Sequence, residues 1–159
     1  MFKRTTDRTK GSSLVEVVVA AAILGSVSLA FFGSFAALSR FHQKSMLSIK
    51  GSLLAEEGLE ALRLMKDDGW TNLSAIPTAT DRYLALGTST WSASTTPEVV
   101  DGVFYRSFRL YPVSRDASDD IVTAGGTVDP DTLLAESAVS WSWRGSTTTV
   151  TYMTYVTNI

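Results

Sequence analysis

The sequence predicts an α+β fold in which one long amino-terminal helix packs against an antiparallel β-sheet. Near the amino terminus, an uncharged apolar run continues directly into a one-sided helical pattern. The carboxyl-terminal part alternates apolar and small polar residues in two runs that a glycine-containing turn separates. Because neither a one-sided helix nor a one-sided sheet can bury its apolar face alone, we expect the two to cover each other.

The composition excludes several kinds of chemistry. The chain has 159 residues, 45% of them hydrophobic and 19% charged, which is typical of a folded protein and not of a disordered one. It contains no cysteine and a single histidine, so it offers no disulfides, no Cys or His zinc cluster and no cysteine nucleophile. The GxSxG and HExxH motifs are also missing from the sequence. We therefore expect a protein that is not an enzyme and that needs no cofactor.

The charge is distributed unevenly along the chain. The first ten residues carry a net charge of +3, whereas the remainder carries −5. Residues 17–39 contain no charged side chain, and these 23 positions exceed the roughly 20 helical residues that cross a bilayer. Because basic segments tend to stay in the cytoplasm, everything after about Phe41 is expected beyond the membrane. The sequence thus predicts a single-pass protein of the cytoplasmic, or inner, membrane.

The junction between the basic leader and the apolar run carries one unusual residue. Residues 10–19 read KGSSLVEVVV, which places Glu16 at the mouth of the apolar helix. A carboxylate at the edge of hydrocarbon costs several kcal/mol unless it is paired or lies at the interface. A basic leader, Gly11 and a glutamate five residues later resemble the processing site of type IV prepilins and pseudopilins.

The resemblance implies a specific maturation and assembly. A prepilin peptidase would cleave after Gly11 and methylate the new terminus at Ser12, where the family commonly has phenylalanine or methionine. The retained helix would stay in the lipid until an inner-membrane assembly platform draws it into a filament of other pilins or pseudopilins. There, Glu16 would pair with the amino terminus of a neighbouring subunit. The chain would then divide into residues 1–11, the leader; 12–39, the transmembrane and filament-core helix; 40–68, its amphipathic continuation; and 69–159, the extracytoplasmic sheet region.

The amphipathic continuation is predicted from a shared apolar face. The residues on that face are Leu47, Leu54, Leu59, Leu62 and Met65. We expect a helix over residues 13–66, ended by Asp67-Asp68-Gly69, with Arg63 and Asp67 paired at i,i+4. Residues 54–63 and 67–70 also resemble minor prepilins of the pilus-modification type, although an ordinary amphipathic helix accounts for the same pattern.

The remaining residues predict a loop followed by strands. Residues 71–97 are predicted to form a loop with one short strand near 82–86. Residues 103–111 are predicted to form a strand. Pro112 follows this strand and argues against an interior position in a sheet at that end. Arg106 and Arg109 are expected to face solvent, and because the exported part is acidic we expect no nucleic-acid partner. The closing hairpin comprises residues 138–143 and 149–156 with a turn at 144–146; its face of Val139, Trp141 and Trp143 should cover the helix.

An acidic segment is a candidate calcium site. Its members, which we expect in a loop around Gly125-Gly126, are Asp116, Asp119, Asp120, Asp129 and Asp131. Calcium prefers oxygen ligands on flexible loops, and some pseudopilins bind it in this part of the domain. The spacing does not match an EF-hand, and the simpler interpretation is that these carboxylates face water.

Three functions are compatible with these patterns. The resemblance favours a minor pilin or pseudopilin, which packs by its helix in a type IV pilus, a secretion pseudopilus or a competence filament, at the tip or along the shaft. The alternative is a single-span membrane-anchored extracellular binding protein that never polymerises. An anchored hydrolase fits least, because the one histidine, His42, lies at the membrane exit.

Overall fold

The fold consists of one long helix and two antiparallel sheets. The computed structural model describes the backbone of residues 10–159 and the side chains of residues 14–159. Helix α1 (Lys10–Asp67) begins in one compact unit and continues into a second, Met46–Ile159, which contains every strand. The predicted leader, residues 1–11, lies outside the described residues except for the first backbone positions of α1. The α+β class and the long amino-terminal helix are confirmed.

Helix α1 ends where the sequence predicts. The Asp68 N–H donates to the Leu64 carbonyl at 3.0 Å, and the Gly69 N–H donates to the Lys66 carbonyl at 2.9 Å. Gly69 has a φ of 145°, a conformation that suits glycine and stops the helix. The observed end at Asp67 is one residue beyond the predicted one.

The predicted ion pair at this end of the helix is wrong. Arg63 contacts Glu60 at 3.1 Å, whereas Asp67 contacts the neighbouring Lys66 at 2.9 Å. Both acidic partners are largely exposed, so these pairs add little to the stability of the fold.

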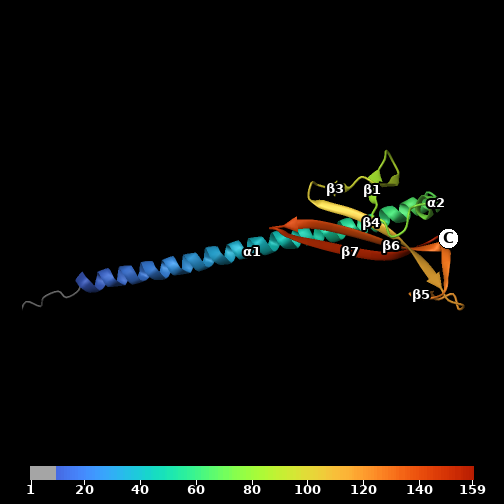
Figure 1. Cartoon of the computed structure of the whole chain (residues 1–159). Coiled ribbons are helices and arrows are strands. Elements are labelled where there is room, and N and C mark those ends of the chain that lie inside the picture. The colour runs from blue at the N-terminus through green and yellow to red at the C-terminus, as the bar shows by residue number, and fades with distance from the viewer. Residues whose placement is uncertain (1–9) are drawn as a thin grey trace, which may run out of the picture. The chain divides into compact units, whose positions relative to one another are not determined.

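The larger sheet is antiparallel and has the strand order β3-β4-β6-β7 (Figure 1). Its strands are β3 (Glu98–Val100), β4 (Phe104–Arg115), β6 (Thr127–Trp143) and β7 (Ser146–Thr157), and the short β5 (Ile121–Val122) pairs with the end of β4. The predicted hairpin is β6–β7, which pairs without interruption over twelve residues of each strand. Its turn uses Arg144 and Gly145, both at positive φ, as a two-residue turn between twisted strands requires.

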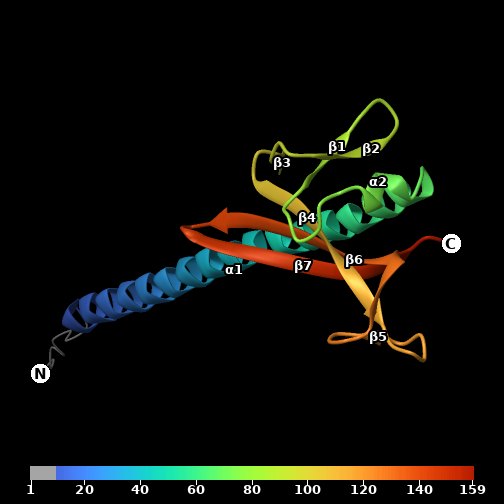
Figure 2. The ribbon, with the colours of Figure 1, turned by 45° about the vertical axis from the view of Figure 1, so that its right-hand side comes forward.

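The region predicted as a loop is more ordered than expected. The predicted short strand is β1 (Tyr83–Leu86), but it pairs with β2 (Trp91–Ser94) in a separate two-stranded sheet, and a short helix α2 (Thr71–Ser74) precedes both (Figure 2). Strand β4 also runs on through Pro112. A register shift between Pro112 and Val113 accommodates the missing N–H donor.

The core lies between α1 and the inner face of the larger sheet. The predicted helix face is confirmed, because Leu54, Leu59, Leu62 and Met65 are buried and Leu47 is half-buried. On the sheet, Val139 and Trp141 are buried against this helix as expected, whereas Trp143 is half-exposed. The two layers therefore cover each other as the patterns of the helix and the hairpin require.

Two glycines allow α1 to approach the sheet closely. A Cβ atom at Gly51 would lie 2.3 Å from Cζ3 of Trp141, and one at Gly58 would lie 2.3 Å from Oγ of Ser137. The Ser137 hydroxyl is buried against this helix and has no hydrogen-bond partner among the described residues. A side chain at Gly51 would push the helix and sheet apart because the Trp141 ring is rigid, and one at Gly58 would displace the Ser137 hydroxyl.

Arg106 is buried, which corrects the prediction that it faces solvent. Its side chain is 2% exposed, and Nε and Nη2 donate to the Glu98 carboxylate at 2.8 and 2.7 Å. Nη1 lies 3.3 Å from the Glu57 carboxylate and 3.4 Å from the Leu54 carbonyl, both on α1. Burial opposes the positive charge, but the hydrogen bonds and charge of Glu98 outweigh it and raise the pKa of Arg106. One guanidinium thus ties α1 to the edge strand β3.

Arg109, on the other face of β4, does face solvent as predicted. It is 41% exposed and pairs with Asp81, with Nε 2.6 Å from Oδ1. The alternation of side chains along a strand explains why two arginines three residues apart have opposite surroundings.

Candidate functional site

The first candidate site is the apolar part of α1. Among the described residues, α1 is the one helix that is long and apolar enough to cross a membrane, judged by length and composition. Every large hydrophobic side chain between Leu14 and Phe41 is more than half exposed. The uncharged stretch 17–39 would be about 35 Å long at 1.5 Å per residue, which exceeds the roughly 30 Å of a bilayer core. A surface this apolar on all sides needs lipid or other helices around it.

The polar side chains inside the apolar stretch are small, and two of them are hydrogen-bonded locally. The Ser26 hydroxyl donates to the Ile23 carbonyl, and the Ser28 hydroxyl donates to the Leu24 carbonyl, both at 2.8 Å. Serines that return their hydrogen bond to the preceding turn are compatible with a hydrocarbon environment. The stretch can therefore be buried without exposing these hydroxyl donors to lipid.

Glu16 is the charged exception at the beginning of this helix. Its side chain is exposed, and it forms no ion pair with any side chain in the part of the chain that the structure describes. The surface beside it is built from Val15, Val19, Ala20 and Ile23. Gly11 and Ser12 fall in the first turn of α1, and their contacts lie outside the described side chains. Glu16 is thus a carboxylate on an apolar surface, with no partner from residues 14–159.

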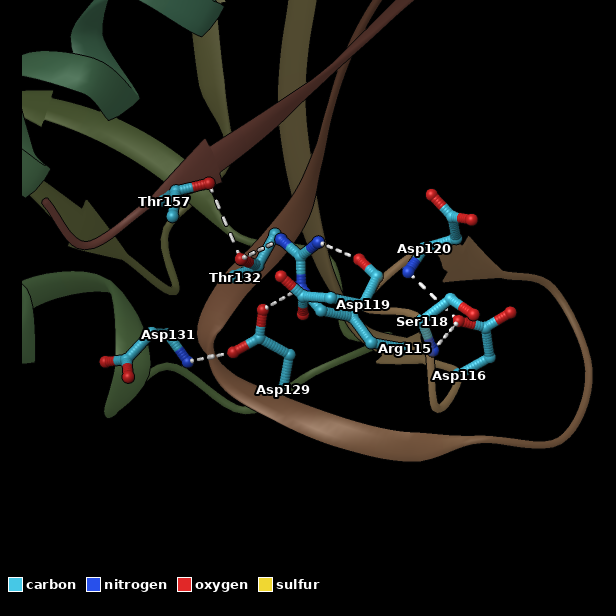
Figure 3. Close-up of polar contacts among 9 residues, drawn as sticks. All are labelled: Arg115, Asp116, Ser118, Asp119, Asp120, Asp129, Asp131, Thr132 and Thr157. Carbon is cyan, nitrogen blue, oxygen red and sulfur yellow. Dashed lines mark hydrogen bonds and ion pairs between the residues drawn. The ribbon is translucent and has the colours of Figure 1, made fainter.

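The acidic segment forms a second cluster, with Arg115 at its centre (Figure 3). Arg115 Nε donates to Asp129 at 2.6 Å, Nη1 donates to the Asp119 carbonyl at 2.8 Å, and Nη2 donates to the Thr132 hydroxyl at 3.3 Å. Asp129 and Asp131 belong to strand β6, which corrects the prediction that they lie in a loop. The guanidinium therefore joins the end of β4 to the beginning of β6.

The other aspartate contacts stabilise the local backbone. Asp116 accepts the N–H groups of Ser118 and Asp120 at 2.8 and 3.0 Å, and Asp129 accepts the N–H of Asp131 at 2.9 Å. Within residues 14–159, no three acidic or histidine side chains converge as metal ligands would. The positive charge among these carboxylates comes from Arg115, which was not among the predicted site residues. Its place in the sequence directly before Asp116 was the available signal.

The charge of Asp129 predicts an acid-dependent step in stability. The hydrogen bond from Arg115, followed by those from Thr132 and the Asp131 backbone, lowers the pKa of Asp129 from 3.8 to about 2. Because the folded pKa lies below the unfolded one, Asp129 stabilises the fold above about pH 4 and loses this contribution as the pH falls toward 2.

We therefore expect the Tm difference between the wild-type chain and Asp129→Asn to be constant from pH 7 to 5 and to close as the pH approaches 2. Tryptophan fluorescence measures it, since all four tryptophans lie in Met46–Ile159. The Arg115→Met variant should also lose this acid-dependent change in Tm, because it lacks the hydrogen bond from Arg115 to Asp129. A Tm difference that persists unchanged at pH 2 would contradict the assignment.

Comparisons of the chain with protein-family models, with curated proteins and with solved structures found no match.

Proposed function

We propose that this chain is a minor pilin or pseudopilin, a non-enzymatic structural subunit of a type IV pilus or of a type II secretion-like filament. The observation that carries the proposal is the position of Glu16, a charged side chain without a described partner on a helix that is apolar on all sides. The basic leader and Gly11 before it support the same interpretation.

The physical argument concerns what Glu16 costs and what could offset that cost. A membrane anchor that stays single needs no carboxylate at the edge of its span, where a charge is unfavourable unless it is paired. In a bundle of such helices, cleavage after Gly11 creates a positive amino terminus at Ser12. Each charge alone is costly in an apolar core, whereas together they satisfy each other and fix the axial register between subunits.

The proposal implies a sequence of partners. A prepilin peptidase acts on the junction at Gly11, membrane lipid holds the apolar stretch, and an assembly platform passes the subunit to other pilins. The subunit therefore belongs first to the cytoplasmic membrane and then to an extracellular or periplasmic filament. The compact unit Met46–Ile159, with its own core between α1 and the sheet, supplies the part of the subunit exposed to water.

Replacing Glu16 with alanine tests the proposal. With the peptidase and partner pilins present, we expect Glu16→Ala to be inserted and cleaved normally, while its amount in sheared filaments falls more than about tenfold. The matched control is Glu56→Ala, which removes an exposed acid from the same helix outside the apolar run and should assemble normally.

Quantitative immunoblotting of sheared filaments and of membranes gives both amounts. Normal incorporation of Glu16→Ala would contradict the pairing of Glu16 with a neighbouring amino terminus. Absence of the wild-type chain from the filaments would favour the alternative, a single-span anchored binding protein that never polymerises, for which Glu16 is an ordinary flanking charge.

A further inference from the structure

The free edge of strand β7 lacks the features that usually protect a sheet edge. β7 is the outermost strand of the larger sheet and pairs only with β6 among the described strands (Figure 2). Its twelve residues, STTTVTYMTYVT, include no charged residue, no proline and no glycine, and its register with β6 is continuous. Edge strands are normally kept apart by charges, prolines, bulges or shortness. The opposite edge has such protection, because β3 is three residues long and carries Glu98.

We propose that β7 is an interaction surface whose partner is β7 of a second copy of this chain, paired antiparallel about a two-fold axis at Thr151. A strand that pairs with itself places equal charges near one another, which is unfavourable. The long strand β4 carries arginines and β6 carries acids, but β7 is neutral throughout. Of these long strands, β7 is the one that can pair with itself without opposing like charges.

The side chains of β7 complement themselves in this register. On the inner face, Tyr152 would lie opposite Val150 of the second copy, and Thr154 opposite Thr148. On the outer face, the exposed Met153 and Tyr155 would lie opposite threonines 149 and 147. Aromatic pairs with β-branched residues and threonine pairs are the cross-strand combinations that stabilise antiparallel sheets. A two-fold contact of this kind is closed, so it joins two copies and no more.

The direction of α1 decides which two copies can meet. Along α1, Gly51 lies against Trp141 and Gly58 lies against Ser137, so the helix runs antiparallel to β6 and therefore parallel to β7. Antiparallel pairing of two β7 strands consequently sets the two helical segments, residues 46–67, in opposite directions. A neighbour in the same orientation would offer β7 only the short strands β3 and β5 of the larger sheet as antiparallel edges. The contact thus joins two chains whose helical segments run in opposite directions, and it does not depend on filament assembly.

Single cysteines test the register, because the natural chain contains none. In the full chain in detergent micelles, we expect mild oxidation to cross-link Thr151→Cys into a dimer, since opposite residues of paired strands lie about 5 Å apart, within disulfide reach. The matched control is Ser107→Cys. Ser107 lies opposite Ala138, which lies opposite Thr151, so Ser107 is on the same face of the sheet but two strands away from the free edge. It should remain a monomer. Equal cross-linking of the two variants, or none at Thr151→Cys, would overturn the proposal.

Charge exchange tests whether the partner is a second copy. We expect Thr151→Lys and Thr151→Glu each to weaken the dimer about fivefold, and an equimolar mixture of the two to restore it. Sedimentation in detergent measures the association, and unchanged tryptophan-fluorescence melting of each variant shows that the fold is intact. If neither charge weakens the dimer, the two copies are in contact through a surface other than β7. If Thr151→Cys cross-links only to another protein, that protein is the partner of β7. Either result overturns the proposal.

Discussion

Replacing Arg106 with methionine is expected to lower the free energy of unfolding of the unit Met46–Ile159 by about 3 kcal/mol. The substitution keeps an apolar stem in a site that is 2% exposed but removes both hydrogen bonds to Glu98 and the charge near Glu57. It leaves the Glu98 carboxylate, itself only 21% exposed, without its partner. Urea unfolding followed by tryptophan fluorescence measures the change.

The same strand provides the control. Arg109 also forms two hydrogen bonds to one carboxylate, that of Asp81, but it is 41% exposed. Arg109→Met should therefore cost less than about 1 kcal/mol. Removing both charges in Arg106→Met/Glu98→Met should recover much of the lost stability, because no uncompensated carboxylate remains. Equal costs for the two arginines would show that the burial of Arg106 contributes little.

Replacing Gly51 with leucine is expected to lower the stability of the same unit by about 3 kcal/mol, because the new side chain overlaps a rigid ring. The first added atom, Cβ, would already lie 2.3 Å from Cζ3, 2.8 Å from Cη2 and 2.9 Å from Cε3 of Trp141. The cost is expected despite the gain in helix propensity over glycine, which is about 1 kcal/mol.

A double-mutant cycle isolates this contact. In the background Trp141→Ala, Gly51→Leu should cost much less, since leucine enters the vacated space. Gly25→Leu is the control, because nothing lies within 4 Å of a Cβ atom at that position on the same helix. If Gly51→Leu costs the same with and without the Trp141 ring, the close approach of α1 to β6 does not limit the residue at position 51.

The predictable part of the fold rests on local periodicity. The apolar run, the shared face of Leu54, Leu59, Leu62 and Met65 and the stop at Gly69 each lie within one helix, so residues near one another in the sequence fix α1. The hairpin β6–β7 is also local, with a two-residue turn between two alternating runs.

The unpredicted part depends on pairings that the local residue pattern does not reveal. The burial of Arg106 is possible only because Glu57, which is distant in the chain on α1, and Glu98, its register partner on β3, both reach it. Strand β2 pairs with β1 although its residues, WSAS, resemble a loop. Asp129 lies in β6 because this strand begins at Thr127, eleven residues before the alternating segment 138–143 from which the strand was predicted.

The candidate site divides in the same way. Glu16 and the apolar span are evident from the sequence, and the structure adds that the span's large hydrophobic side chains are exposed. The grouping of Arg115 with Asp129 and Thr132 required the pairing of β4 with β6, which brings the two ends together. Charge patterns along a chain identify candidates, whereas the sheet register decides which of them meet.

The mature amino terminus tests the central proposal most directly. Intact-mass and peptide mass spectrometry of the chain, expressed in membranes with a prepilin peptidase, would identify it. We expect a product that begins at Ser12 and retains the whole apolar stretch 17–39, while Gly11→Ala stays at full length. A wild-type chain that keeps its basic leader, or a product that has lost the apolar stretch, would contradict the proposed function.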